Sequence, residues 1–246
     1  MVEYLTIITA RTKSKRLPGK VLMKIKNIPI IKIIVDRIKK CKLKNKIVIA
    51  TTNLPSDDYL VNFLVQNKIN FFRGEENNVT KRVLDAAKFY NAKNIILITG
   101  DCPLVDFKLI EKCAFIYEKS KVDFVTNANI RSYPDGMDIQ IFKYNSLIKF
   151  YKKIKRPEEF EHVTLSMRRR ISKNKIINLI AEKKLFYPDL GLTLDEIDDF
   201  KLIKKIFEHF WRKKKRYFDI YQIMSFLKKN KKLMLINTKV KRKGDN

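Results

Sequence analysis

The chain has 246 residues, of which 45% are hydrophobic and 33% are charged. This length is typical of one α/β domain, and the apolar fraction excludes an intrinsically disordered chain. Lysine and arginine number 54 against 26 aspartates and glutamates. The resulting net charge of +28 suits a polyanionic partner, but an abundance of lysine on solvated faces is the favoured explanation.

The sequence shows none of the usual marks of export or membrane insertion. Its N-terminal stretch lacks a long apolar segment with a small-residue cleavage site, and no run approaches the roughly 20 apolar residues of a membrane helix. The cysteines, Cys41, Cys102 and Cys113, form neither a CxxC pair nor a disulfide framework. We therefore expect a cytoplasmic protein without a membrane partner.

Strand-like apolar runs alternate with helical periodicity through the first half of the sequence. We expect strands at 4–10, 46–52, 69–72, 94–99 and 123–128, and helices at 29–41, 57–67, 79–90 and 107–118. Such alternation is typical of βαβ units, so the pattern predicts an α/β fold with a parallel sheet.

The second half has a less regular pattern, which we interpret as a small mixed subregion that binds the second substrate. The expected strands there are 137–142 and 175–182, and the expected helices are 146–153, 158–170 and 196–210. We therefore expect one domain over residues 1–210.

Residues 211–246 form a basic, aromatic-containing C-terminal extension. From residue 201 onward the chain holds 16 lysines and arginines against 3 acidic residues, interleaved with aromatics such as Trp211, Phe218 and Tyr221. This composition fits either polyanion binding or solvated lysines beside an amphipathic helix that packs its rings. The second interpretation is favoured, so nucleic acid is not the expected partner.

The loop after the first expected strand, residues 10–20, carries five cationic side chains. Arginine forks onto phosphate oxygens, and lysine acts as a point charge on a leaving pyrophosphate. The loop is neither a Walker loop nor GxGxxG, so the common phosphate-loop and dinucleotide interpretations lose their main support. Because ligands of open α/β sheets bind at the carboxyl ends of strands, this place favours a triphosphate site over a merely solvated loop.

Asp101 follows the strand expected at 94–99. A carboxylate there is suited to hold Mg²⁺ against a triphosphate, although aspartate in this place also forms ordinary turns and helix caps. Cations and a carboxylate, without a Ser/His/Asp set, suit nucleotidyl transfer, in which positioning and electrostatics dominate.

Several motifs make a family resemblance specific. The segment A-R-T-K-S-K-R-L-P-G-K resembles the first loop of the CMP-sugar synthetases, which include CMP-Kdo synthetases and acylneuraminate cytidylyltransferases. In particular, the chain is similar to the spore coat polysaccharide type of cytidylyltransferase. The matching segments, in order, are R-G-E-E-N-N-V from Arg73, G-D-C-P-L-V-D from Gly100, Y-P-D-G-M-D from Tyr133 and E-H-V-T from Glu161.

The resemblance implies a three-layer, Rossmann-like nucleotide-diphospho-sugar transferase fold whose smaller subregion serves the acceptor and dimerisation. It implies a homodimer that joins CTP to a sugar acid of the nonulosonic type, releases pyrophosphate, uses Mg²⁺ and serves surface polysaccharide or glycan synthesis. The implied catalytic residues are Arg11, Arg16, Lys20 and Asp101. The implied nucleotide-binding residues are Ala10, Arg11, Arg16, Lys20, Arg73, Arg82, Gly100 and Asp101.

Further roles follow from the same resemblance. Asp195, in L-T-L-D-E-I-D-D-F, is the second metal carboxylate, although it also suits the N-cap of the next helix. The implied acceptor-binding residues are Tyr133, Asp135, Gly136, Asp138 and His162. Apart from the resemblance, Pro-Asp-Gly is good turn chemistry, a lone histidine is more often structural, and Arg73 or Arg82 equally suits a solvated face.

Two alternatives stay open at the level of sequence. The first is a nucleotidyltransferase that acts on a phosphorylated sugar or alditol and gives a diphosphate-linked product. The second is a non-catalytic protein that keeps the fold and binds polyanions through its lysine-rich extension.

Overall fold

The computed structural model describes residues 3–242. Its main sheet has the order β5-β4-β1-β6-β8-β7-β9, and a two-stranded hairpin lies beside it. The strands of the main sheet are β1 (Tyr4–Thr9), β4 (Asn45–Thr52), β5 (Asn70–Gly74), β6 (Asn94–Thr99), β7 (Phe124–Thr126), β8 (Gln140–Lys143) and β9 (Ile176–Asn178); the hairpin is β2 (Lys24–Ile25) with β3 (Ile28–Pro29).

The helices follow the strands in alternation through the first half of the chain. The α-helices are α1 (Ile30–Ile38), α2 (Asp58–Gln66), α3 (Val79–Phe89), α4 (Phe107–Lys119), α5 (Tyr144–Tyr151), α6 (Glu158–Glu161), α7 (Leu165–Arg170), α8 (Ile197–Arg212), α9 (Ile220–Lys229) and α10 (Lys231–Met234). Short 3-10 helices are η1 (Lys20–Leu22), η2 (Pro55–Asp57) and η3 (Lys173–Lys175).

The first four strands of the main sheet are parallel, with β1 paired to β4 on one side and to β6 on the other. β8 then runs antiparallel to both β6 and β7, while β9 pairs in parallel with β7. The predicted mostly parallel sheet with a mixed second half is therefore confirmed.

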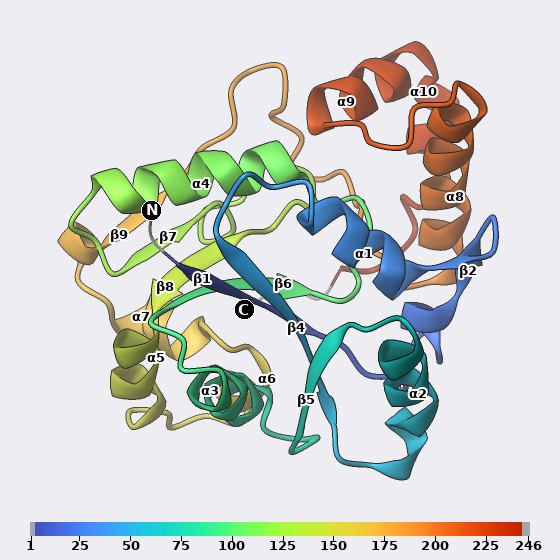
Figure 1. The fold of residues 1–246 in the computed structure, drawn as a ribbon. Helices are drawn as coiled ribbons and strands as arrows, with labels where there is room; N and C mark the ends of the chain where they lie inside the picture. The colour runs from blue at the N-terminus through green and yellow to red at the C-terminus, as the bar shows by residue number, and fades with distance from the viewer. Residues whose placement is uncertain (1–2, 243–246) are drawn as a thin grey trace.

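Helices cover both faces of the sheet and make three layers (Figure 1). Successive residues of β1 face opposite sides, so Ile8 packs in one hydrophobic cluster and Ile7 in the other. The first cluster includes buried residues of α1, α2, α4, α8 and α9, and the second includes those of α3, α5 and α7. Strands buried on both faces explain the nearly continuous isoleucine and valine runs.

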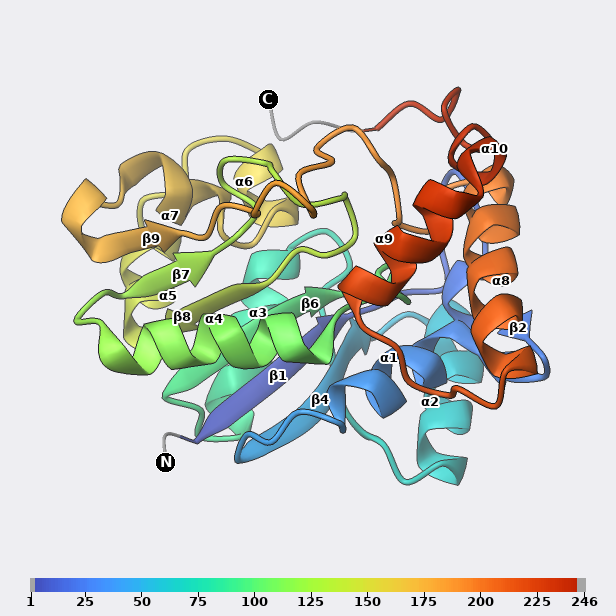
Figure 2. The same ribbon diagram turned by 90° about the horizontal axis from the view of Figure 1, so that it is seen from above.

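The chain after residue 210 packs against the same core as the rest. α8 crosses the expected boundary at residue 210 and ends at Arg212, and Figure 2 shows α9 running beside α8 and α1. The rings of Phe210 and Phe218 stack with centroids 4.1 Å apart, and both belong to the larger hydrophobic cluster. Phe218 and Trp211 of the extension therefore serve packing, as the amphipathic interpretation predicts, whereas Tyr221 is 48% exposed.

One helix boundary was predicted wrongly. The helix expected over 158–170 is two helices, α6 and α7, because the chain turns to an extended conformation at His162. The β2–β3 hairpin was not predicted, and the extension, where an amphipathic helix was expected without bounds, contains α9 and α10. Within the described part of the chain, no helix is both long and apolar enough to cross a membrane.

Candidate active site

The cationic loop after β1 is held in place by a buried carboxylate that the sequence analysis missed. Asp57 is 0% exposed, and its Oδ1 accepts hydrogen bonds from the backbone N–H and Oγ1 of Thr12, at 2.7 and 2.6 Å. Its Oδ2 accepts from Thr51 Oγ1 at 2.8 Å and from Thr52 N at 3.1 Å. Burial alone would raise the pKa of Asp57, but the hydrogen bonds led by Thr12 lower it below its ordinary value. The loop is thus tied to the carboxyl end of β4.

Lys20 stands at the centre of the site. Gly19 takes a left-handed conformation, with φ of 70°, immediately before η1, which begins at Lys20. The Lys20 Nζ lies 2.9 Å from Asp101 Oδ2 and 3.0 Å from Asp195 Oδ1. Burial alone would lower the pKa of Lys20, but the two carboxylates outweigh it and raise the pKa above its ordinary value. The lysine therefore stays charged between two anions.

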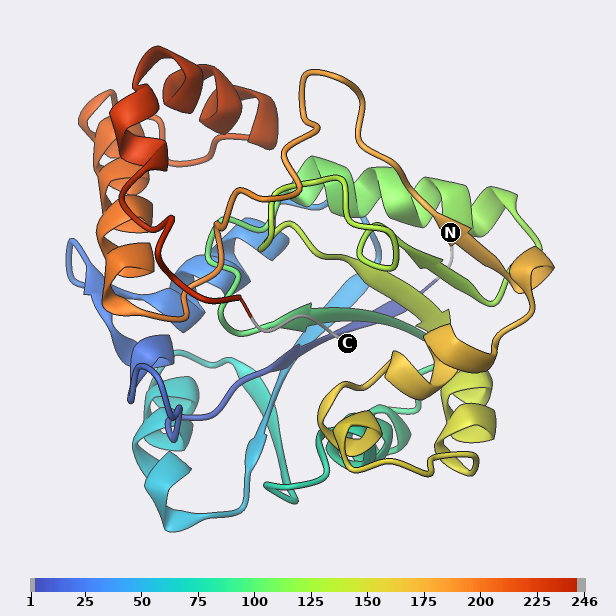
Figure 3. The ribbon, with the colours of Figure 1, turned by 180° about the vertical axis from the view of Figure 1, so that it is seen from behind.

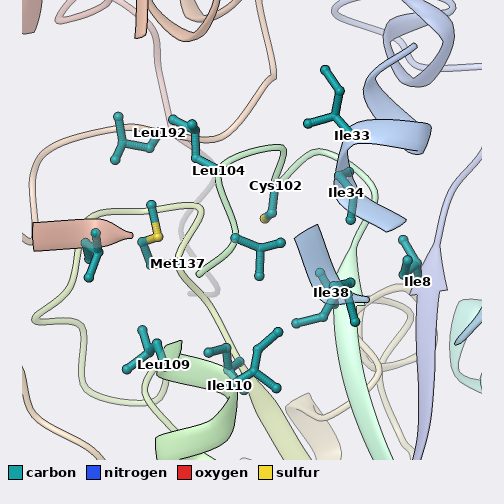
Figure 4. Close-up of a cluster of buried hydrophobic side chains, with 14 of the residues drawn as sticks. Ile8, Ile33, Ile34, Ile38, Cys102, Leu104, Leu109, Ile110, Met137 and Leu192 are labelled. Atoms are coloured by element: carbon teal, nitrogen blue, oxygen red, sulfur yellow. The ribbon is translucent and has the colours of Figure 1, made fainter. Parts of the chain in front are cut away.

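Asp101 comes from the turn that follows β6. Burial would raise its pKa, yet the charge of Lys20 and hydrogen bonding lower the pKa and keep the carboxylate ionised. The side chain of the next residue, Cys102, lies among core residues that include Ile34 and Leu104 (Figure 4), and its Sγ is 3.7 Å from Asp101 Oδ1. Cys102 is 1% exposed, and burial raises the pKa of its thiol well above the ordinary value. We therefore assign Cys102 to packing.

Two small residues let the ends of β1 and β6 approach each other. A Cβ on Gly100 would lie 2.8 Å from the carbonyl oxygen of Thr9 and 2.9 Å from the Cβ of Ala10, which is itself buried. Any larger residue at position 100 would push Asp101 away from the loop that carries Lys20. Ala10 and Gly100 thus shape the floor beside the nucleotide-binding residues expected here.

Asp195 is free of the helix cap considered for it. The N-cap of α8 is Glu196, which forms a capping box with Asp199. The Asp199 carboxylate accepts the backbone N–H groups of Asp195 and Glu196, at 3.0 and 2.9 Å. The side chain of Asp195 instead pairs with Lys20 and with Arg16, whose Nη2 is 2.8 Å from Asp195 Oδ1. Arg16, Lys20, Asp101 and Asp195 therefore meet as one cluster.

Two further arginines of the expected nucleotide site, Arg11 and Arg82, lie close to each other. Arg82 is 2% exposed; burial first, and the nearby charge of Arg11 second, lower its pKa to about 10. Its Nη1 donates to the carbonyl oxygen of Glu76 at 3.3 Å. Arg11 Nη2 lies 3.9 Å from Glu161 Oε1, so this cation lies between Arg82 and the motif that includes His162.

Arg73 contacts the turn that follows β4, and its expected role in nucleotide binding stays a prediction. Its Nε and Nη2 donate to the carbonyl oxygens of Thr52 and Leu54, at 2.9 and 2.8 Å, and Nη2 also pairs with Asp58 at 2.8 Å. These contacts fix the turn that carries Asp57. In this structure Arg73 supports the loop from behind.

The turn expected to bind the acceptor lies against the segment that precedes Asp195. Gly136 has φ of 99°, and a Cβ there would lie 2.6 Å from the carbonyl carbon of Leu192, so the two segments pack backbone to backbone. Asp135 and Asp138 both pair with Arg131, whose Nη1 is 3.0 Å from Asp135 and Nη2 is 3.1 Å from Asp138. Burial raises the pKa of Asp135, while Arg131 opposes that rise.

Tyr133 and His162 are placed differently from one another. Tyr133 is 2% exposed and belongs to the hydrophobic core, where burial raises its pKa to about 12. It is therefore not brought to the surface of the acceptor turn. His162 ends α6 next to Glu161, the residue paired with Arg11, and its backbone carbonyl oxygen accepts from Leu165 N at 2.8 Å.

The comparisons with known proteins agree with this arrangement. Residues 5–236 match the cytidylyltransferase family. The chain is 30% identical to spore coat polysaccharide biosynthesis protein SpsF of Bacillus subtilis, over 85% of this chain and 88% of that protein. A solved cytidylyltransferase from Leptospira borgpetersenii serovar Hardjo-bovis superposes with a TM-score of 0.87 at 30% identity, covering 95% of this chain and 97% of that one.

A more distant solved structure shares the fold. It is CMP:2-keto-3-deoxy-manno-octonic acid synthetase in complex with CTP, with a TM-score of 0.62 and 14% identity, over 85% of this chain and 99% of that one. The predicted nucleotidyltransferase fold is thus confirmed. With the cluster of Lys20, Asp101 and Asp195 at the carboxyl edge of the sheet, the chain belongs to the cytidylyltransferase family and is a nucleotidyltransferase that uses CTP.

Proposed function

We propose that the enzyme transfers the cytidylyl group of CTP to a sugar acid of the nonulosonic type and releases pyrophosphate, for surface polysaccharide or glycan synthesis. The observation that carries the proposal is the contact of one ammonium, Lys20 Nζ, with two carboxylates, Asp101 and Asp195, next to Arg16. Cations for a triphosphate and oxygens for a metal are thus gathered at one point.

Each residue has a definite role in this reaction. An acceptor hydroxyl oxygen bonds to the α-phosphorus of CTP and loses its proton, and the bond from that phosphorus to the pyrophosphate oxygen breaks. Arg11, Arg16 and Lys20 stabilise the charge on the phosphates. The tether from Asp57 to Thr12 holds their loop in one geometry, so little reorganisation accompanies the reaction.

The donor set suits Mg²⁺ bound together with the substrate. Magnesium in such enzymes takes one or two carboxylates plus phosphate oxygens, and Asp101 and Asp195 supply two carboxylates, each within 3.0 Å of Lys20 Nζ. When bound, Mg²⁺ would neutralise charge on the phosphates.

The acceptor site is proposed at the turn of Asp135, Gly136 and Asp138. Carboxylates suit sugar hydroxyls, and Arg131 between them adds a cation. The synthetase that shares this fold is named for a sugar acid, 2-keto-3-deoxy-manno-octonic acid, and this supports an acidic acceptor here. His162, beside Glu161, is proposed to complete the acceptor site from the opposite side.

A phosphorylated sugar or alditol is the second candidate acceptor. Basic residues close to the acceptor turn favour this candidate, because arginine donates hydrogen bonds to phosphate oxygens as it does to carboxylate oxygens. The non-catalytic alternative finds no support, since the cations and carboxylates of the reaction are present together. The homodimer and the cytoplasmic location stay predictions.

The test is pyrophosphate release by the purified protein with Mg²⁺, each of the four nucleoside triphosphates, and a panel of nonulosonic acids, phosphosugars and phosphoalditols. We expect release only with CTP and a sugar acid. The Asp101→Asn variant serves as the matched control, with activity reduced about 10²–10³-fold. Release only with phosphorylated acceptors would establish the second candidate, and undiminished activity of Asp101→Asn would refute the metal role of Asp101.

A further inference from the structure

The chain after α10 returns to the active site. Figure 3 shows this segment running from the helices α9 and α10 back toward the middle of the molecule. Asn237 is 4% exposed, and its Nδ2 donates to the carbonyl oxygen of Gly191 at 2.9 Å and to Asp199 Oδ1 at 2.7 Å. Val240 is also buried. Residues 237–242, here called the return segment, are thus anchored where α8 begins.

The anchor includes a fitted position for Arg242. Its Nη2 donates to Asp199 Oδ1 at 2.7 Å and its Nη1 to Thr193 Oγ1 at 2.8 Å. A Cβ at position 191 would lie only 1.8 Å from Arg242 Nη2, so the guanidinium occupies the space that Gly191 leaves. The same Asp199 carboxylate holds the backbone of Asp195 in place.

The return segment also contacts the catalytic cluster itself. Arg16 Nη1 donates to the carbonyl oxygen of Lys241 at 3.0 Å, while Nη2 of the same arginine pairs with Asp195. Arg242 Nη1 lies 3.9 Å from Asp195 Oδ2. The return segment therefore touches the phosphate-binding loop at Lys241 and the metal carboxylate at Arg242.

Arg242 lies toward the acceptor side of this cluster. Thr193, which accepts from Arg242, donates to Asp135 Oδ2 at 3.4 Å, and Asp135 pairs with the backbone of Gly191 as an isolated bridge. The charge of Arg242 also opposes the rise that burial causes in the pKa of Asp135. The guanidinium is thus placed between Asp195 and the acceptor turn, on the far side of Asp195 from Lys20.

We propose that Arg242 is a specificity-determining residue, which binds the anionic group of the acceptor and makes the enzyme select acidic acceptors over neutral ones. The inference rests on the proposed function and deepens it. A guanidinium carries five N–H donors, and its bonds to Thr193 and Asp199 engage two of them. With 24% of its side chain exposed, it has room for a carboxylate or a phosphate, both of which arginine recognises.

The kinetic test compares Arg242→Gln and Arg242→Lys with Lys239→Gln, a control at an exposed position of the return segment. We expect Arg242→Gln to raise the KM for the acidic acceptor at least about tenfold and leave the KM for CTP within about twofold, as one lost charged contact predicts. Arg242→Lys should recover part of the loss. Gly191→Ala, which displaces the guanidinium while the arginine is kept, should repeat the Arg242→Gln result. The acceptor whose KM rises most in Arg242→Gln, sugar acid or phosphosugar, identifies the anionic group that Arg242 binds.

A binding measurement separates this proposal from the proposed function. Isothermal titration calorimetry with a CMP-linked sugar acid and its uncharged carboxamide should show a preference for the acid of about tenfold, absent in Arg242→Gln. That result supports the role of Arg242 even for a protein that releases no pyrophosphate. An unchanged preference in Arg242→Gln, equal affinity of the wild type for acid and carboxamide, or a rise in the KM for CTP alone would each overturn it.

Discussion

The Lys20 Nζ lies 3.0 Å from Asp195 Oδ1, although the two residues are 175 positions apart in the chain. The contact joins the first strand's loop to the segment before α8. Asp101, in the turn that follows β6, contacts the same ammonium. Three distant parts of the sequence therefore meet at Lys20. Lys20 compensates the charge of both carboxylates, and Arg16 shares that role at Asp195, so the lysine has a structural and an electrostatic role together.

Replacing Lys20 is expected to impair catalysis strongly. Lys20→Gln removes the cation that we propose stabilises the leaving pyrophosphate, so kcat/KM for CTP should fall about 10²–10³-fold. Lys24→Gln, on an exposed strand position four residues later, is the control and should keep wild-type activity. Steady-state pyrophosphate release measures both. A loss of less than threefold in Lys20→Gln would exclude Lys20 from the reaction.

Asp57 should matter for both stability and nucleotide binding. Asp57→Asn replaces one acceptor oxygen by an NH₂ group among N–H and O–H donors, which should lower the free energy of unfolding by about 3 kcal/mol. The loop would also loosen, and the KM for CTP should rise about tenfold. Asp85→Asn, which removes a partly exposed ion pair with Lys81 on α3, is the control and should change the urea midpoint little. Equal effects of the two variants would contradict the tether.

Two glycines with positive φ provide a matched pair for stability. Gly136→Ala combines a left-handed conformation with a Cβ 2.6 Å from the backbone of Leu192. Its free energy of unfolding should therefore be about 3 kcal/mol lower than that of the wild type. Gly19→Ala has φ of 70° but no atom within 4 Å of the added Cβ, so only about 1 kcal/mol should be lost. Urea unfolding of both variants checks the difference, and equal losses would show that the backbone contact is unimportant.

Glu159 makes stability depend on acid pH. It is 0% exposed; burial would raise its pKa, but the hydrogen bonds from Arg170 and from the backbone of Lys155 outweigh it and lower the pKa to about 2. Because the folded pKa lies below the unfolded value, this stabilisation is fully present above about pH 4.5 and is lost as pH falls toward about 2. Urea midpoints of the wild type should therefore drop between pH 5 and pH 3.

The Glu159→Gln variant tests the source of that dependence. It cannot be deprotonated, so its midpoint should start lower and change less over the same pH range. Glu3→Gln, at a glutamate whose side chain is 70% exposed, is the control and should keep the wild-type pH dependence. If the urea midpoint of Glu159→Gln changes with pH as steeply as that of the wild type, other carboxylates are responsible for the pH dependence.

The parallel half of the sheet was predictable because its strands are buried on both faces. Continuous apolar runs such as β6 are typical of strands in a parallel sheet. The carboxyl ends of such strands lie at one edge of the sheet, which brings Asp101 and the loop of Lys20 together. Their 2.9 Å contact fits that expectation. The chemistry-bearing loops were therefore visible in the sequence.

Other parts depend on contacts that no local pattern reveals. Tyr133 appeared in a polar turn, yet its ring is buried in the core, and Arg73 donates to backbone carbonyl groups that lie 19 and 21 positions away. The break between α6 and α7 was missed because residues 158–170 contain neither glycine nor proline. Arg242 lies in a lysine-rich stretch, and only the space left by Gly191 distinguishes it from its neighbours.

The return segment has a consequence for how the protein is made. A ribosome synthesises the residues of the central sheet first, and domains begin to fold as they emerge. The surroundings of Asp195 are complete only when Asn237 and Arg242 have been added and have reached Asp199. A nascent chain that already contains every strand therefore still lacks two side chains that donate hydrogen bonds to the buried Asp199. A fragment released after α10 should accordingly be less stable than the full protein and more exposed to proteolysis.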